Sequence, residues 1–138
     1  ITSSSPVVAE DGTIYLGVNQ SHASVSPTGK LNWRLDMSPT GYVPWDWVRA
    51  TPTVLGATNV LALGTDLALV LFQANGDWQW NFSMEAGSYS SPAIAPDGTI
   101  YAAALGGKMF AIKNSVPPAN SSWPMFRADP QHTGRARR

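Results

Sequence analysis

The chain of 138 residues contains no cysteine. Disulfides, zinc sites built from thiolates and cysteine nucleophiles are therefore all excluded. Histidine is also scarce: His22 and His132 lie far apart in the chain, so the spacing typical of metal ligands is missing. We expect His22 to be an exposed turn residue and His132 to take part in a turn or capping hydrogen bond.

Charged residues and long apolar runs are few. Only 13% of the residues are charged, and nine basic side chains balance nine acidic ones. Nothing in this balance suggests a nucleic-acid partner. The longest apolar stretch, 67–72, is far shorter than a membrane helix requires, so we expect no transmembrane segment.

Recognisable catalytic motifs are also missing. The sequence has no nucleophile elbow, no P-loop and no dinucleotide fingerprint. Most acidic residues belong to turns, which leaves Asp36, Asp46 and Glu85 without an immediate structural explanation. We therefore assign no catalytic residue and no cofactor or metal site, and we lean against an enzyme.

What the chain does contain is a repeat. The segment SSPVVAEDGTIYLG at 4–17 returns as SSPAIAPDGTIYAA at 90–103, and a weaker copy lies at 50–64. A period of about forty residues is typical of propeller blades or of paired-helix repeats. Short β-branched runs, Asp-Gly turns and the lack of a 3.6-residue apolar period favour the β alternative.

Each copy continues with a third strand, a turn and a further strand that carries tryptophan. Gly29 lies four residues before Trp33, and Gly76 lies four before Trp80. In the third copy Trp123 follows through a longer proline-rich link. The sequence therefore predicts an all-β fold of about three four-stranded antiparallel meanders.

These residues resemble the PQQ-like repeat family of β-propellers, which includes quinoprotein dehydrogenases and the propeller lipoprotein of outer-membrane β-barrel assembly. The family's tryptophan-docking motif is matched by Ala23, 28–30 and Trp33, with Val25 where the motif has aspartate. The segment WPMFRADPQHTGR at 123–135 is similar to one found at the ends of such propellers. Because this fold serves catalysts, scaffolds and sugar binders alike, the resemblance implies the fold more than the function.

The resemblance assigns Trp33, Trp80 and Trp123 a structural docking role. An indole on an outer strand can lie flat against the neighbouring blade and donate its N–H group to a backbone carbonyl. The quinoproteins of this family hold their cofactor with a disulfide of adjacent cysteines and a calcium ion. This chain has no cysteine, so no cofactor is expected.

The internal repeat sets the expected domain organisation, which is a single repeat domain over 1–138. Its parts are blade one at 4–37, an inserted loop at 38–49, blade two at 50–85, blade three at 90–126 and a C-terminal tail at 127–138. Closed propellers have about four to eight blades. We therefore expect a partial propeller, closed only by homo-oligomerisation or by a longer parent chain.

The inserted loop interrupts the repeat and holds the candidate ligand-binding residues. They are Tyr42, Trp45, Asp46, Trp47 and Arg49. Flat aromatic side chains beside charged groups suit sugar rings, aromatic ligands or a protein hot spot. The alternative is that both tryptophans serve local packing.

The first interpretation of function is a non-catalytic interaction or assembly module, located in the periplasm, secreted or on the cell surface. The alternative is a carbohydrate-binding or carbohydrate-processing domain that uses the aromatic loop. A remnant PQQ-dependent quinoprotein is a third possibility.

Overall fold

The computed structural model describes residues 4–19, 21–36, 50–56, 60–64 and 68–136. These residues form antiparallel β-sheets and turns and contain no helix. The sheets are open, and none closes into a barrel. The all-β prediction is therefore confirmed for the described part of the chain.

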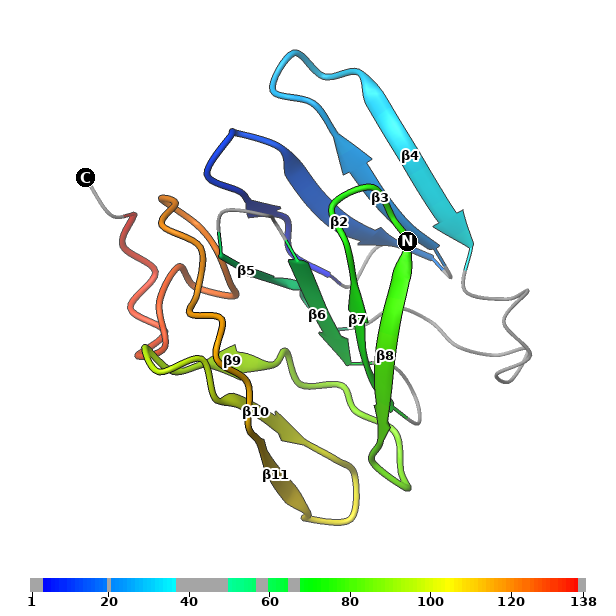
Figure 1. Ribbon diagram of the computed structural model, residues 1–138, viewed down its shortest axis with the longest axis vertical. Helices are drawn as coiled ribbons and strands as arrows, with labels where there is room; N and C mark the ends of the chain where they lie inside the picture. Colours follow the sequence, from blue (N-terminus) through cyan, green and yellow to red (C-terminus); the bar gives the residue numbers. More distant parts are fainter. Residues whose placement is uncertain (1–3, 20, 37–49, 57–59, 65–67, 137–138) are drawn as a thin grey trace.

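Three consecutive units of chain each form one sheet (Figure 1). The strands of the first unit are β1 (Val7–Val8), β2 (Ile14–Val18), β3 (Ser21–Val25) and β4 (Leu31–Asp36). Those of the second are β5 (Thr53–Leu55), β6 (Val60–Gly64), β7 (Ala68–Phe72) and β8 (Trp78–Ser83). Those of the third are β9 (Ala93–Ile94), β10 (Ile100–Ala103) and β11 (Met109–Ile112). Strands adjacent in the sequence are adjacent in each sheet, so every unit is a meander.

The Asp-Gly turns that the sequence pointed to are built alike in the first and third units. The Asp11 carboxylate accepts a hydrogen bond from the Thr13 amide at 2.9 Å, and Asp97 accepts one from Thr99 at the same distance. The glycine between them has a positive φ in both turns, 82° at Gly12 and 91° at Gly98. A residue without a Cβ is needed there, because other side chains clash in this conformation.

The fourth strands of the first two units join their sheets in the same way. The register shifts between Ser24 and Val25 where β3 meets β4, and at the equivalent place where β7 meets β8. After this bulge Trp33 lies opposite Ser24, and Trp80 lies opposite Leu71. Both tryptophans are therefore held on the same face of their sheets by the same irregularity.

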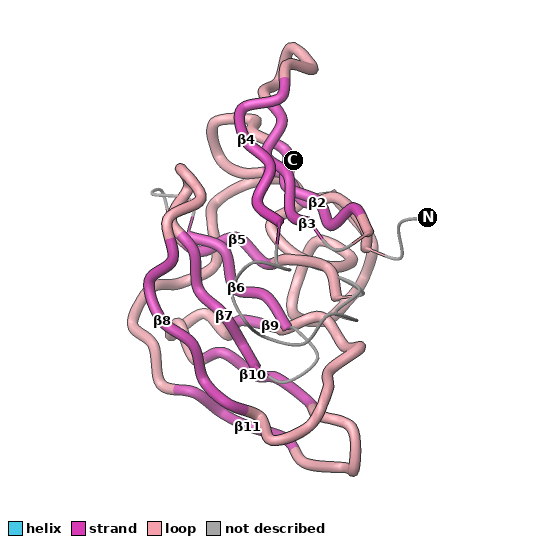
Figure 2. The backbone as a smooth tube through the Cα atoms, turned by 90° about the vertical axis from the view of Figure 1, so that its right-hand side faces the viewer, coloured by secondary structure: helices cyan, strands magenta, loops and turns pink. Residues whose placement is uncertain are grey.

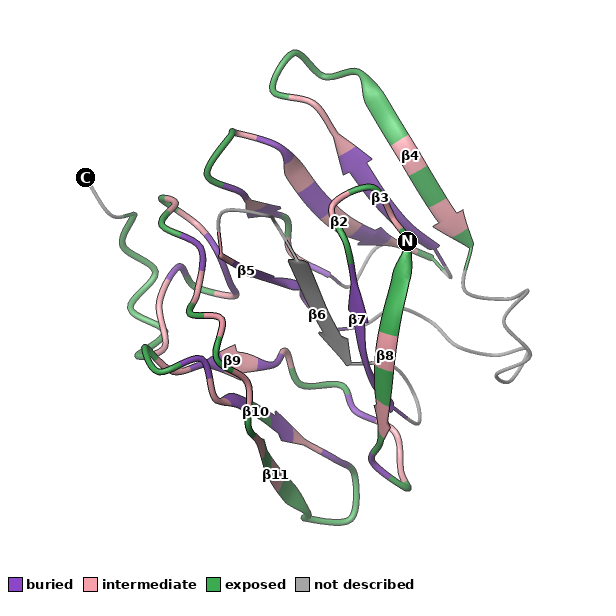
Figure 3. Cartoon of the chain, in the orientation of Figure 1, coloured by how far each residue is buried: buried purple, intermediate pink, exposed green. Residues whose placement is uncertain are grey.

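The sheets lie one above another in chain order, as two perpendicular views show (Figures 1 and 2). Two apolar cores separate them, one between the first and second sheets and one between the second and third. We call the face of a sheet that points toward the next unit its forward face, and the opposite face its rear face. The residues of β7 alternate between the two cores, so both faces of this strand are buried (Figure 3).

The third unit differs from the expected four-stranded meander, because the described chain forms only three strands there. After β11 the chain turns away to the first strands of the other two units. Pro117–Pro124, which we call the C-terminal segment, makes isolated β-bridges between Trp123 and Val8 and between Pro118 and Leu55. Trp123 thus pairs with the first unit and is not on a fourth strand of the third.

Candidate functional site

The predicted ligand-binding loop lies outside the described residues. This applies to Tyr42, Trp45, Asp46, Trp47 and Arg49 alike. The described residues offer other candidates, at the contacts between the units and at the ends of the stack.

A ladder of equivalent hydrogen bonds joins the three units. The Ser5 amide donates to the Thr51 hydroxyl at 3.0 Å, and the Thr51 amide donates to the Ser91 hydroxyl at 2.9 Å. Each of these residues directly precedes one of the repeated prolines. Within the described part of the chain, the Ser91 amide and the Ser5 hydroxyl have no partner, so the ladder has a donor at one end and an acceptor at the other.

Trp33 joins the first unit to the second. Its indole Nε1 donates to the carbonyl of Ala74 at 2.7 Å. The ring packs on Gly76, where an added Cβ would lie 3.4 Å from the indole, and its centroid is 6.0 Å from that of Tyr15. The indole thus buries apolar area while its polar atom is satisfied.

The other two predicted docking tryptophans are placed differently. Trp80 packs at the margin of the core between the second and third sheets, beside Phe82. Phe82 in turn meets Phe110 edge to face at 5.3 Å. Trp123 is half-buried, and its carbonyl accepts a hydrogen bond from the Val8 amide at 2.8 Å. Trp80 therefore lies at a junction between sheets, whereas Trp123 lies beside the first strand of the chain.

The forward face of the third sheet is apolar and open. Phe110 and Ile112 point back into the core, which leaves Met109 and Ala111 on the forward face. Tyr101 lies opposite Ala111 on the neighbouring strand. Met109 is 74% exposed and Tyr101 43%. Alternating strands normally place polar residues on a solvated face, so this face has the composition of a buried one.

The rear face of the first sheet is its counterpart. Tyr15 points forward into the core, so the alternating residues Ile14, Leu16 and Val18 lie on the rear face. Leu31 lies opposite Val25 on that side and is 55% exposed. Arg34 and Asp36 of β4 share this rear face with Leu16 and Val18. Each end of the stack therefore presents a group of apolar strand residues, and the group on the first sheet is bordered by these two charged residues.

The prediction for His22 was wrong. It lies in β3, is only 4% exposed, and its Nε2 atom has no hydrogen-bond partner in the structure. Burial lowers the pKa of His22 to about 3, because a charged imidazole would lose its hydration there. His132 does lie in a turn, where its amide donates to the Asp129 carbonyl at 2.9 Å.

Two acidic residues in the described part of the chain have lowered pKa values. Glu85 forms an ion pair with Lys108, and the pKa of Glu85 is lowered by this hydrogen bond and by the charge of the lysine. The pKa of Asp97 is lowered by the Thr99 amide. Asp36 ends β4, and Asp46 lies outside the described residues. No group of three potential metal ligands occurs among the described residues.

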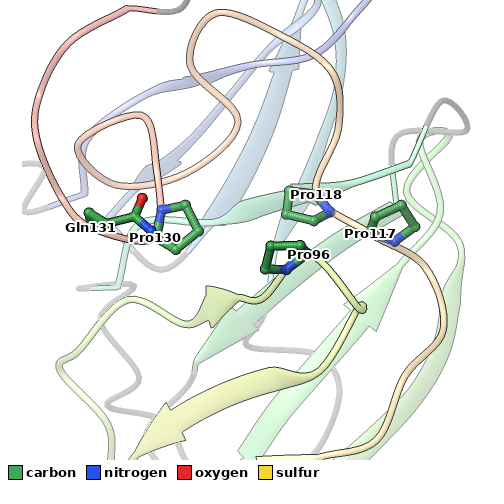
Figure 4. Close-up of a pocket in the computed structure, with 5 residues that line it drawn as sticks. All are labelled: Pro96, Pro117, Pro118, Pro130 and Gln131. Atoms are coloured by element: carbon green, nitrogen blue, oxygen red, sulfur yellow. The ribbon is translucent and has the colours of Figure 1, made fainter.

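One hollow of about 360 Å³ lies between the third unit and the chain that follows it. It is lined by Pro96, Pro117, Pro118, Pro130 and Gln131 (Figure 4). Four proline rings offer a rigid apolar wall, and the single amide provides the only side-chain hydrogen-bonding group among these residues. It contains no acid, base or nucleophile, so no chemistry can be assigned to it.

No protein-family model matches this chain, and no curated protein matches it in sequence. None of the described residues forms a helix that could cross a membrane. The candidate site consists of the two sheet faces at the ends of the stack and the two open ends of the serine–threonine ladder. This ladder was not predicted, although a hydroxyl residue stands before each repeated proline in the sequence.

Proposed function

We propose that the chain is a non-catalytic assembly module of propeller-type blades whose two end faces bind each other on separate copies. The observation that carries this proposal is the pair of apolar end faces. At each internal junction a forward face packs on a rear face, and one face of each kind is left over. The forward face of the third unit on one copy therefore suits the rear face of the first unit on another.

The serine–threonine ladder also supports contact between the third unit of one copy and the first unit of another. Between units, an amide that precedes a repeated proline donates to the hydroxyl at the equivalent position of the next unit. The Ser91 amide on one copy and the Ser5 hydroxyl on another, which have no partner among the described residues, would add one more such bond. Its donor and acceptor are in the correct order for head-to-tail contact.

A head-to-tail interface closes into a ring only if its rotation allows closure, and otherwise it extends into a fibre. Two copies would bring together six units, which lies within the range of closed propellers. The Trp33 contact on the second unit is the arrangement that the resemblance to PQQ-like repeats implies. We include in the proposal the exported location that this resemblance favours.

The test uses two variants that each block one face. Leu16→Glu places a charge on the rear face of the first unit, and Tyr101→Glu places one on the forward face of the third. A charge buried without a partner costs several kcal/mol. Each variant alone is therefore expected to be monomeric by light scattering.

An equimolar mixture of the two variants distinguishes this interface from others. Each variant retains the face that the other needs, so the mixture is expected to form a dimer of one copy of each and no larger species. Leu31→Glu, at an exposed position on the same rear face, serves as a second variant if Leu16→Glu disturbs the circular dichroism. A wild-type protein that stays monomeric at high concentration would refute the proposal.

A further inference from the structure

The third sheet has an edge at the place where the other two sheets carry a fourth strand. In the first two units β4 and β8 pair with β3 and β7, whereas among the residues that the structure describes β11 ends the sheet of the third unit. The first three strands of this unit otherwise follow the pattern of the first unit, down to the pairing of Ile100 with Ile112, which matches Ile14 with Val25. An edge strand of this kind exposes unpaired backbone groups and can accept another strand.

The two fourth strands that are present show what such a strand has to carry. The burial of β4 and β8 follows one pattern, with Trp33 and Leu35 in the first and Trp80 and Phe82 in the second turned to the forward side. The shared requirement is therefore a tryptophan followed two residues later by a large apolar side chain, after a glycine four residues upstream.

The strand pairing of the second unit shows where the tryptophan and the large apolar residue of an added strand would lie on the third sheet. Since Trp80 lies opposite Leu71 and Phe82 opposite Leu69, the equivalent positions on β11 are Ala111 and Met109. Ala111 is exposed and small enough to leave room for an indole, and Met109 is the most exposed large apolar residue described. Lys113 follows β11, at the place where an incoming strand would begin. Its positive charge would attract an acidic residue at the start of that strand, such as Asp77 before β8.

We infer that the free edge of β11 is a binding site for an extended peptide strand of a separate polypeptide with the pattern Gly-x-x-x-Trp-x-Leu or Phe. The strand pairs with β11 through its backbone, covers Met109 with its large apolar residue and sets its tryptophan beside Ala111. Main-chain bonds give affinity, and the alternate side chains give specificity.

The first unit also contains a turn that could contact the tryptophan of the added strand. This contact rests on the proposed function, because the turn would belong to a second copy of the chain. The turn around Gly29 is built like the turn that receives Trp33: the amide of Gly29 donates to Ser26 and that of Gly76 to Gln73, both at 2.9 Å. Nothing lies within 4 Å of a Cβ added at Gly29. In a head-to-tail assembly the added strand would present its indole to this turn on the next copy.

The experiment uses a fluorescein-labelled peptide with the sequence of residues 75–83, NGDWQWNFS, and the full chain carrying Leu16→Glu. This background is expected to be monomeric, so binding is measured without self-association. We expect saturable anisotropy, at least tenfold weaker binding of the peptide with Trp80→Ala, and little change for the peptide with Trp78→Ala. Amide exchange of 109–112 is expected to slow when the peptide binds.

Two protein variants provide the control. Ala111→Arg puts a long charged side chain where the indole would lie and is expected to weaken binding at least tenfold, whereas Gln79→Arg, an exposed position on β8, is expected to leave it unchanged. Equal binding to both variants, or no slowing of exchange in β11, would overturn the inference. Binding only to associated wild-type chains would also overturn it, because a second copy would then form the site.

Discussion

At the scale of single residues, His22 makes the stability of the chain depend on pH. Its pKa is lowered from 6.5 to about 3 by burial, so the unfolded chain takes up a proton that the folded chain refuses between these values. The contribution of His22 is therefore favourable above pH 6.5 and is lost as the pH falls toward 3. We expect the free energy of unfolding to fall by about 1 kcal/mol per pH unit in this range, measured by urea denaturation.

Leu69 occupies the position equivalent to His22 in the second unit, which makes His22→Leu the matched variant. Subtracting its pH profile from that of the wild type removes the contributions of Glu85 and Asp97, whose pKa values are also lowered. Parallel profiles would show that His22 is not the group responsible. The sequence did not predict this burial because β3 already begins at Ser21, whereas in the third unit β11 begins only at Met109, after a turn at 104–108. Alignment of the copies therefore placed His22 in a turn.

At the scale of strands and turns, Trp33 ties β4 to the second unit through one ring and one hydrogen bond. Trp33→Ala removes the contacts with Tyr15 and Gly76 and leaves the Ala74 carbonyl without its donor. We expect a loss of about 3 kcal/mol in the free energy of unfolding. Trp33→Phe retains an aromatic ring but not the N–H donor, so we expect it to lower the free energy of unfolding by only about 1 kcal/mol.

Trp78→Ala is the control for these measurements, because Trp78 is 59% exposed on the equivalent strand of the second unit. Its effect is expected to stay within about 0.5 kcal/mol. Equal losses for Trp33→Ala and Trp78→Ala would show that the interior contact of Trp33 contributes nothing particular to stability.

The strands and turns were the most predictable features of the fold. Asp-Gly turns and alternating apolar residues act locally, so the two hairpins with Asp11 and Asp97 could be read from the sequence. The spacing from glycine to tryptophan likewise predicted the position of Trp33, because the turn and the bulge fix the register. Trp123 has no such turn before it, and its pairing with Val8 is a long-range contact that no local pattern encodes.

At the scale of the whole molecule, the C-terminal segment connects the last unit to the first strands of the other two. The Val54 amide donates to the Pro124 carbonyl at 2.8 Å, and the Ser121 hydroxyl donates to the Val8 carbonyl at 2.5 Å. Ala119 is fully buried in the core between the first and second sheets. The C-terminal segment therefore joins residues that lie more than a hundred positions apart in the sequence.

These contacts of the C-terminal segment predict the behaviour of a shortened chain that ends at Asn114. It lacks every bond of the C-terminal segment and also Met125, which is 1% exposed in the core between the second and third sheets. Removal of a buried methionine side chain alone costs about 2–5 kcal/mol, so we expect the shortened chain to lose its cooperative thermal transition. A synthetic peptide covering 115–136, added in excess, is expected to restore the transition, because the contacts with β1 and β5 do not require a continuous chain. A shortened chain that melts like the full one would show that the stacked sheets hold together without this segment.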